Sequence, residues 1–125
     1  LKKVGGMNKS LSGSSSKWVY NGRSFKSSYN IPIDEKGFTK SNLKLGQKVH
    51  KEYKSDLHNN ISRFKEYKLL SGKRIDYIDF DSKTIYELKP HNPKQIAKGK
   101  KQLNEYLKEV EELYGPGWKT VLDTY

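Results

Sequence analysis

The sequence contains no cysteine among its 125 residues. This absence excludes disulfides, iron–sulfur clusters, zinc ribbons and thiol catalysis. No apolar run approaches the roughly 20 residues that cross a membrane, and no signal-peptide core is visible. Hydrophobic residues make up only 33% of the chain, so the core must be small. A single domain of this length still buries about two-thirds of its unfolded surface, which is enough to fold without covalent links.

Acidic residues are scarce: 14 Asp and Glu stand against 25 Lys and Arg, for a formal net charge of +11. The isoelectric point is accordingly near 9.7. This excess favours a polyanionic partner, with nucleic acid first, an anionic membrane surface second and an acidic protein third.

Residues 1–33 have no acidic residue at all and are rich in Ser, Gly and Asn. This composition is typical of a linker or weakly ordered arm, so we divide the chain into residues 1–33 and a domain at 34–125. A tether is favoured over a basic arm that touches phosphates. Because the chain begins with Leu1 rather than methionine, we expect a piece of a longer protein. We expect four aromatic residues to hold part of the arm down, namely Trp18, Tyr20, Phe25 and Tyr29.

Helical patterns occur in two places. Ser41 or Asn42 can cap a helix whose apolar positions, near a 3.6-residue period, run from Leu43 to Leu57. A second short helical or irregular stretch follows over residues 61–70. A long helix is predicted over residues 93–114, with Asn92 as its cap, Pro93 at its first position and Gly115 at its end.

The most informative segment is residues 74–90. Two β-prone runs flank the polar turn at residues 81–83, which predicts a hairpin. Alternation places Ile85, Glu87 and Lys89 on one face of the second run. Pro90 ends this strand because it lacks an N–H donor. Residues 118–125 could supply one more strand.

Asp76 on the first hairpin strand and Glu87 on the second can come close enough to share one ion. Hard divalent cations such as Mg²⁺ prefer oxygen ligands of this kind. A lysine beside such a site, here Lys89, can orient or activate the attacking water. The alternative without a functional role is a cross-strand salt bridge between these surface charges, worth under about 1 kcal/mol of stability.

Composition alone makes Glu-x-Lys a weak signal. With 8 Glu and 22 Lys in the chain, chance predicts about 1.4 such triplets. The sequence has three, at residues 52–54, 66–68 and 87–89. Only the third is predicted on a strand, since the first two fall in expected helices, where residues two apart face different ways. Gln102 and Tyr106, four apart on the next helix, can both point toward the strand ends.

Three segments together carry a family resemblance: GKRIDYID at 72–79, IYELKPHNP at 85–93 and GKKQLNEY at 99–106. They resemble the PD-(D/E)XK nuclease superfamily. More narrowly, they are similar to the restriction-endonuclease-like toxin domains at the tips of bacterial polymorphic toxins, including contact-dependent inhibition, Rhs-type and wall-associated effectors. The resemblance implies an α/β (α+β) fold: an αβββαβ core whose mixed sheet of about four strands is flanked by helices.

The resemblance also implies roles for individual residues. Asp76, Glu87 and the Leu88 carbonyl would bind a divalent metal, most simply Mg²⁺, with Mn²⁺ or Zn²⁺ as alternatives. Lys89 would position or activate the water, and Gln102 and Tyr106 would support the site from the helix. Many members add a carboxylate from the first core helix, for which we select Glu52 and leave His50 and Asp56 open. Ile75 departs from the proline of the superfamily name, and Asp79 is a rival that alternation places on the opposite face.

Phosphates would be bound by a basic cluster at the start of the second helix and beside the first hairpin strand, namely Lys94, Lys98, Lys100, Lys101, Lys73 and Arg74. The basic first half and acidic second half of this helix oppose its dipole, which indicates a partner. An ordinary solvated helix face is the alternative.

The resemblance implies a metal-dependent endonuclease toxin that cuts DNA inside a competing bacterium. It would be delivered as the tip of a larger secreted or surface-borne effector, act in the target-cell cytoplasm and be blocked by a cognate, acidic immunity protein. The runner-up is an RNase, for tRNA above all, with the same fold and site. A non-catalytic nucleic-acid-binding module and a pore-forming or membrane-surface toxin are the remaining classes. Membrane action would require an apolar or strongly amphipathic helix, and the sequence pattern predicts none.

Overall fold

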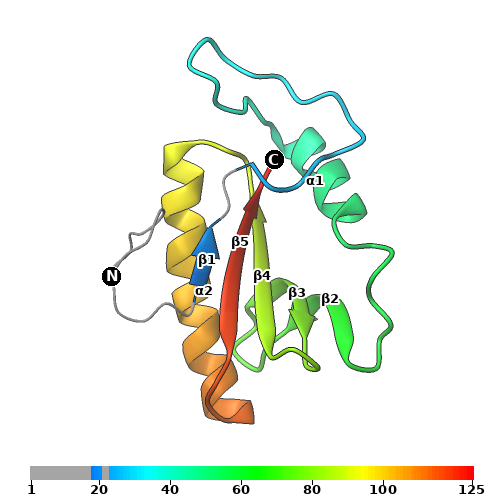
Figure 1. Ribbon diagram of the computed structural model, residues 1–125, viewed down its shortest axis with the longest axis vertical. Coiled ribbons are helices and arrows are strands. Elements are labelled where there is room, and N and C mark those ends of the chain that lie inside the picture. Colours follow the sequence, from blue (N-terminus) through cyan, green and yellow to red (C-terminus); the bar gives the residue numbers. More distant parts are fainter. Residues whose placement is uncertain (1–17, 21–22) are drawn as a thin grey trace.

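The computed structural model describes residues 18–20 and 23–125, which form two helices and five strands (Figure 1). In chain order these are β1 (Trp18–Tyr20), α1 (Leu43–Glu52), β2 (Arg63–Lys68), β3 (Arg74–Asp79), β4 (Thr84–Lys89), α2 (Pro93–Tyr114) and β5 (Lys119–Thr124).

The strands form one mixed sheet in the order β1-β5-β4-β3-β2. The β2, β3 and β4 strands are antiparallel neighbours, whereas β5 lies parallel to β4 on one side and to β1 on the other. From α1 to β5 the elements follow the predicted αβββαβ order, so the fold class is confirmed. The short β1 adds a fifth strand at the edge of this sheet.

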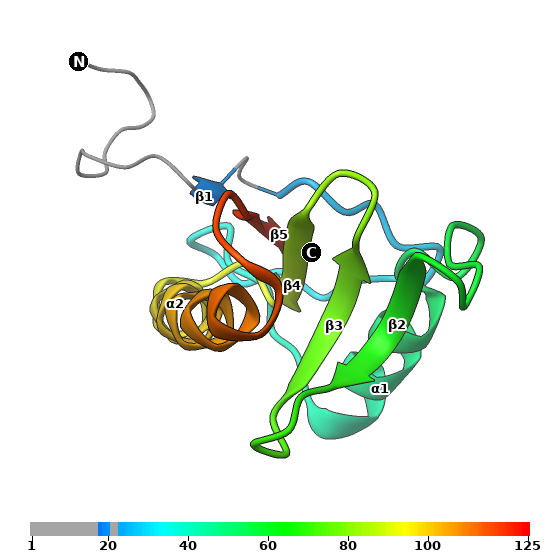
Figure 2. The same ribbon diagram turned by 90° about the horizontal axis from the view of Figure 1, so that it is seen from below.

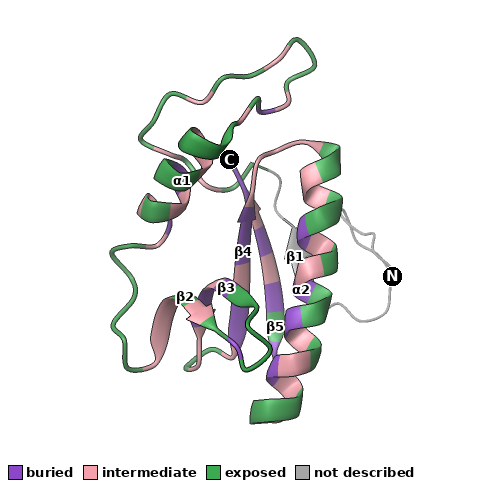
Figure 3. Cartoon of the chain, turned by 180° about the vertical axis from the view of Figure 1, so that it is seen from behind, coloured by how far each residue is buried: buried purple, intermediate pink, exposed green. Residues whose placement is uncertain are grey.

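The two helices pack on opposite faces of β4 because its side chains alternate. Ile85 belongs to the core cluster that α2 covers, together with Leu103 and Val110. Leu88 belongs to the cluster that α1 covers, together with Val49. Figure 2, seen from below, shows α1 and α2 on opposite sides of the sheet, and Figure 3 shows that the central β4 is largely buried. The predicted alternation along residues 84–89 is confirmed.

Helix α1 begins where the sequence predicted, since Asn42 Oδ1 accepts a hydrogen bond from Leu45 N at 2.8 Å. Its predicted extension to Leu57 is wrong. Tyr53 at the C-cap is already extended, and Lys54 follows with a φ of 53°, in the left-handed region. The chain therefore turns away, and Leu57 lies 44% exposed instead of on a buried helical face.

The helical or irregular stretch predicted over residues 61–70 is also wrong in large part, because it contains β2. Glu66 has a φ of 53°, which interrupts the alternation of the strand. Phe64 and Tyr67, three residues apart, consequently pack on the same core with ring centroids 5.4 Å apart. Apolar spacing of three imitates a helix in the sequence, whereas pairing with β3 makes this segment a strand.

Helix α2 has the predicted bounds, with the Asn92 side chain accepting from Gln95 N at 2.9 Å. Two of its acidic residues stabilise the domain directly. Glu109 accepts hydrogen bonds from Ser71, and Glu111 accepts two backbone N–H groups just before β5. These contacts explain part of the charge distribution that opposes the helix dipole.

Part of the predicted arm, residues 23–33, lies against α1 and β5. Phe25 N donates to Thr124 O at 2.9 Å, and the Phe25 ring packs edge-on against Tyr53. Ser24 Oγ donates to Asp123 Oδ1 at 2.7 Å. Residues 1–17 and 21–22 and the side chains of β1 lie outside the described part. Within the described residues, no helix is both long and apolar enough to cross a bilayer.

Candidate active site

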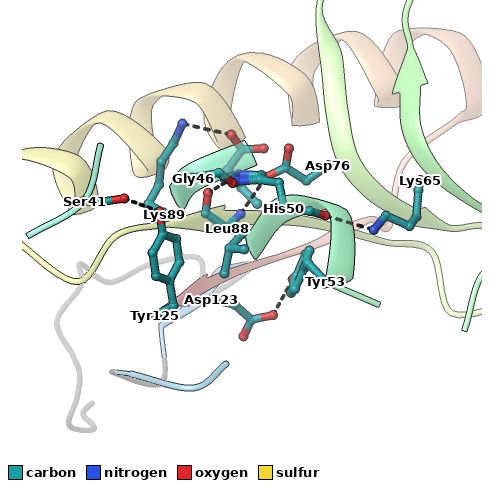
Figure 4. A network of polar contacts seen from close by, with 11 residues as sticks. Ser41, Gly46, His50, Tyr53, Lys65, Asp76, Leu88, Lys89, Asp123 and Tyr125 are labelled. Carbon is teal, nitrogen blue, oxygen red and sulfur yellow. Dashed lines mark hydrogen bonds and ion pairs between the residues drawn. The ribbon is translucent and has the colours of Figure 1, made fainter. Parts of the chain in front are cut away.

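The candidate active site lies where β3 and β4 diverge. Their ladder runs from Asp79–Thr84 to Tyr77–Tyr86 and then ends. Beyond this last pair, Asp76 Oδ2 accepts a hydrogen bond from the Leu88 backbone N–H at 2.8 Å (Figure 4). The Asp76 side chain thus takes the place of a backbone hydrogen bond between the two strands. Divergence therefore leaves the Asp76 carboxylate, 13% exposed, between two strands of the core.

Glu87 is the most deeply buried charged residue of the site, with only 3% of its surface exposed. Its Oε2 lies 3.2 Å from Lys89 Nζ on the same face of β4. Its Oε1 is buried and has no hydrogen-bond partner. Burial, reinforced by the negative charge of Asp76, raises the pKa of the Glu87 carboxyl to about 8, although Lys89 opposes this shift. An ionised Glu87 here lacks sufficient compensating positive charge.

These groups fit a hard divalent cation. Asp76, Glu87 and the Leu88 carbonyl offer oxygen ligands, and the unpartnered Oε1 of Glu87 is a buried acceptor that an ion would satisfy. In the part of the chain that the structure describes, no three His, Cys, Asp or Glu side chains converge closely enough to hold an ion by themselves. A backbone oxygen such as that of Leu88, together with water, would therefore complete the ligand set.

His50 is the α1 residue that the structure brings to these strands. Its Nε2 lies 3.0 Å from Leu88 O and 3.3 Å from Asp76 Oδ2, and its Nδ1 lies 2.9 Å from Gly46 O (Figure 4). Since Gly46 O and Leu88 O are acceptors, each ring nitrogen donates. Burial alone would lower the pKa of His50, but the hydrogen bond to Asp76 and its charge outweigh burial and raise it to about 9.

Glu52, the residue selected from the sequence to complete the site, is not brought to this cluster. Its two carboxylate oxygens accept hydrogen bonds from Ser27 and Ser28. Asp56 is exposed in the turn after α1. The sequence left His50 open as an alternative but did not single out Lys65, whose Nζ donates to the carbonyls of His50 and Lys51 at 2.9 Å and anchors the end of α1.

Helix α2 brings Gln102 and Tyr106 toward the same face of β4. The Gln102 Oε1 is buried without a hydrogen-bond partner. Burial, followed by the charges of Glu87 and Asp76, raises the pKa of the Tyr106 hydroxyl well above its ordinary value. Asp79 lies elsewhere and accepts backbone N–H groups of the turn at residues 81–82.

The predicted phosphate-binding residues divide into two groups. Lys94, Lys98 and Lys101 are exposed on the first half of α2, and Lys100 is partly buried there. The remaining two, Lys73 and Arg74, lie at the start of β3, where the charge of Lys73 lowers the pKa of Glu109 after the larger effect of the hydrogen bonds from Ser71. Lys73 is thus close to a carboxylate of the same chain.

Gly99 permits α2 to approach β4 at the site. A Cβ at this position would lie 2.7 Å from Leu122 Cδ1 and 2.9 Å from Lys89 Cγ, both too close. We therefore expect Gly99→Ala to displace Lys89, to cost about 1–2 kcal/mol of stability after its gain in helix propensity, and to slow the nucleic-acid cleavage expected from the sequence at least about tenfold. Thermal unfolding and cleavage assays check this.

Gly46→Ala on α1 is the matched control, because its Cβ would meet nothing closer than the Tyr125 hydroxyl at 3.6 Å. Equal stability and activity of the two variants would contradict a role for close packing at Gly99.

A comparison with protein families matches residues 38–125 to a model described as restriction endonuclease fold toxin 9. The match covers α1 to β5 and includes every residue of the candidate site. Searches of curated proteins and of solved structures gave no significant match.

Proposed function

The chain belongs to the restriction endonuclease fold toxin 9 family, and from this membership we propose that it is a metal-dependent endonuclease toxin that hydrolyses DNA in target bacteria. The family supports a toxin with nuclease activity. Metal dependence, the DNA substrate and a cognate immunity protein are our proposal.

One observation supports the chemistry most strongly. Asp76 and the Glu87–Lys89 pair meet where β3 and β4 separate, with an unpartnered carboxylate oxygen and the Leu88 backbone beside them. A cross-strand surface salt bridge would be solvated, whereas Glu87 is almost completely buried. Burying an undercompensated carboxylate is costly, so its presence favours a functional role. A non-catalytic binding module would not need this arrangement.

The proposed residues have distinct tasks. Asp76, Glu87 and the Leu88 carbonyl would hold the ion. A bound Mg²⁺ would stabilise the charge on the phosphodiester oxygen and make the attacking water more acidic. Lys89 would hold that water against the phosphorus. Water adds to phosphorus and one P–O ester bond breaks, which leaves a phosphomonoester and a hydroxyl.

Three further side chains would support this geometry. His50 holds the Leu88 carbonyl and contacts the Asp76 carboxylate, so we assign it a positioning role. Gln102 has a free buried oxygen that can accept a hydrogen bond from the water. Tyr106 keeps its proton because of its raised pKa and can donate a hydrogen bond to a phosphate oxygen.

The substrate is tested by digesting supercoiled plasmid and total bacterial RNA in separate reactions. Each polymer is incubated with Mg²⁺, Mn²⁺ or Zn²⁺, with Lys89→Ala as the inactive control. We expect wild-type protein to nick or linearise the plasmid. An intact plasmid with tRNA cut at one place would move the activity to the RNase alternative, and two intact polymers from a folded sample would contradict the nuclease proposal.

Lysines on the first half of α2 are proposed to bind the DNA backbone. We expect Lys94→Gln/Lys98→Gln to weaken DNA binding about tenfold at 150 mM NaCl, and the loss should grow at low salt, because the counterions that these contacts release favour wild-type binding most when the salt concentration is low. Fluorescence anisotropy with labelled duplex DNA measures this. Lys73→Gln should weaken binding less, since Glu109 already lies beside Lys73. Equal losses would place the backbone contacts elsewhere.

We place the site of action in the cytoplasm of the target bacterium, after delivery as the tip of a larger effector. The producing cell would need an immunity protein that covers the site. The +11 charge of the chain suits an acidic inhibitor as well as it suits DNA.

A further inference from the structure

The outer face of α1 carries three exposed lysines, Lys44, Lys48 and Lys51, which we call the α1 lysine face. Their spacing of four and three residues aligns them on one side of the helix. Resting on the proposed function, we infer that the α1 lysine face binds the phosphate backbone of the nucleic acid whose bond is cut. The sequence pattern had indicated backbone contacts on α2 and at the start of β3 only.

Position is the first argument. Lys51 directly follows His50, whose Nε2 reaches Leu88 O at 3.0 Å in the candidate active site. The helix therefore turns one side toward the site and its lysines toward solvent. Lys65 anchors this end of α1 by donating to the carbonyls of His50 and Lys51. A backbone held by the lysines would thus be fixed relative to the cleavage residues.

Charge is the second argument. Among the described residues, no acidic side chain forms an ion pair with any lysine of the α1 lysine face. The carboxylate oxygens of Glu52, the single acidic residue of α1, accept hydrogen bonds from Ser27 and Ser28 and not from a lysine, and its one negative charge leaves the three lysines in excess. Unpaired like charges on one short helix repel each other, and a polyanion removes this repulsion.

The length of the α1 lysine face and an aromatic ring beside it both suit a nucleic acid backbone. The seven helical steps from Lys44 to Lys51 rise about 10 Å along the helix, which matches about three phosphates at 3.4 Å of duplex axis each. Lys48 Nζ lies 5.7 Å from the centroid of the Tyr29 ring, which is 42% exposed. An exposed aromatic ring beside a phosphate-binding lysine can also contact sugar or base.

The test compares two triple variants of equal charge in EDTA, so that no cleavage occurs. One replaces Lys44, Lys48 and Lys51 with glutamine, and the other makes the same change at three exposed lysines outside α1, Lys68, Lys108 and Lys119. Anisotropy is measured over a range of NaCl concentrations with a labelled DNA duplex and, separately, with tRNA. Circular dichroism confirms that each variant is folded.

We expect the α1 variant to bind at least one polymer ten- to a hundredfold more weakly, with the slope of log K against log [NaCl] smaller by about two to three. The control variant should keep most of the affinity and of the slope. Wild-type affinity in the α1 variant, or equal losses in both variants, would overturn the inference and leave this face to an acidic protein. If wild-type protein binds and cuts neither polymer, the proposed function itself fails.

Discussion

Replacing Glu87 with glutamine is expected to abolish cleavage and yet to stabilise the metal-free protein at pH 8. Glutamine removes the charge that a divalent ion requires, so the cleavage rate should fall at least about a thousandfold. The same charge is costly without the ion, because Glu87 is only 3% exposed and its Oε1 has no partner. Function and stability therefore respond in opposite directions at this residue.

The pH dependence follows from the pKa of Glu87, which folding raises from 4.5 to about 8. A carboxyl whose pKa is higher in the folded state stabilises that state fully below pH 4.5 and loses this stabilisation as the pH rises to about 8. The gain from Glu87→Gln should accordingly be small near pH 4.5 and reach about 1–3 kcal/mol near pH 8, or several degrees in Tm.

Thermal unfolding in EDTA at both pH values measures this effect. Glu105→Gln is the control, because it removes the same charge from an exposed position on α2, and it should show no comparable rise in Tm. If Glu87→Gln unfolds at pH 8 at or below the Tm of the wild type, the claim that the Glu87 charge destabilises the metal-free protein is wrong.

The second large effect is expected for Lys89→Met, which should lower the cleavage rate by about 10²–10⁴-fold while retaining metal binding. Lys89 contacts Glu87 at 3.2 Å but contributes no ligand oxygen.

Calorimetric titration with Mn²⁺ separates the role of Lys89 in cleavage from metal binding. Lys89→Met should bind the ion within about tenfold of the wild type, whereas Glu87→Gln should not bind it measurably. Lys108→Met controls for loss of an exposed lysine. Loss of Mn²⁺ binding in Lys89→Met would place this residue in the metal-binding set instead.

Local signals in the sequence were sufficient for much of the fold. The start of α2 is set by its cap Asn92 and by the proline that follows it. The polar turn between β3 and β4 likewise sets the ends of these two strands. Each signal acts within a few residues along the chain. The hairpin register that pairs Tyr77 with Tyr86 also brings Asp76 opposite Glu87, so the centre of the site follows from alternation and one turn.

The features that the sequence did not reveal depend on contacts between distant segments. Strand β2 forms because it pairs with β3, and the left-handed backbone at Glu66 hides its alternation. The α1 residue that reaches the site could not be chosen either. Glu52 is bound by Ser27 and Ser28, more than twenty residues earlier, and His50 is left facing Leu88. No local pattern encodes that arrangement.

The most direct test of the proposed centre is a Mg²⁺ titration of plasmid nicking by wild-type protein and by Asp76→Asn. The residue links both strands of the site through its hydrogen bond to Leu88 N, and the amide keeps its shape but not its charge. We predict that wild-type nicking rises with Mg²⁺ to a plateau, stops in EDTA, and is absent in folded Asp76→Asn at every Mg²⁺ concentration. Wild-type nicking that persists in EDTA, or nicking by Asp76→Asn at the wild-type rate, would contradict a metal-dependent centre at Asp76 and Glu87.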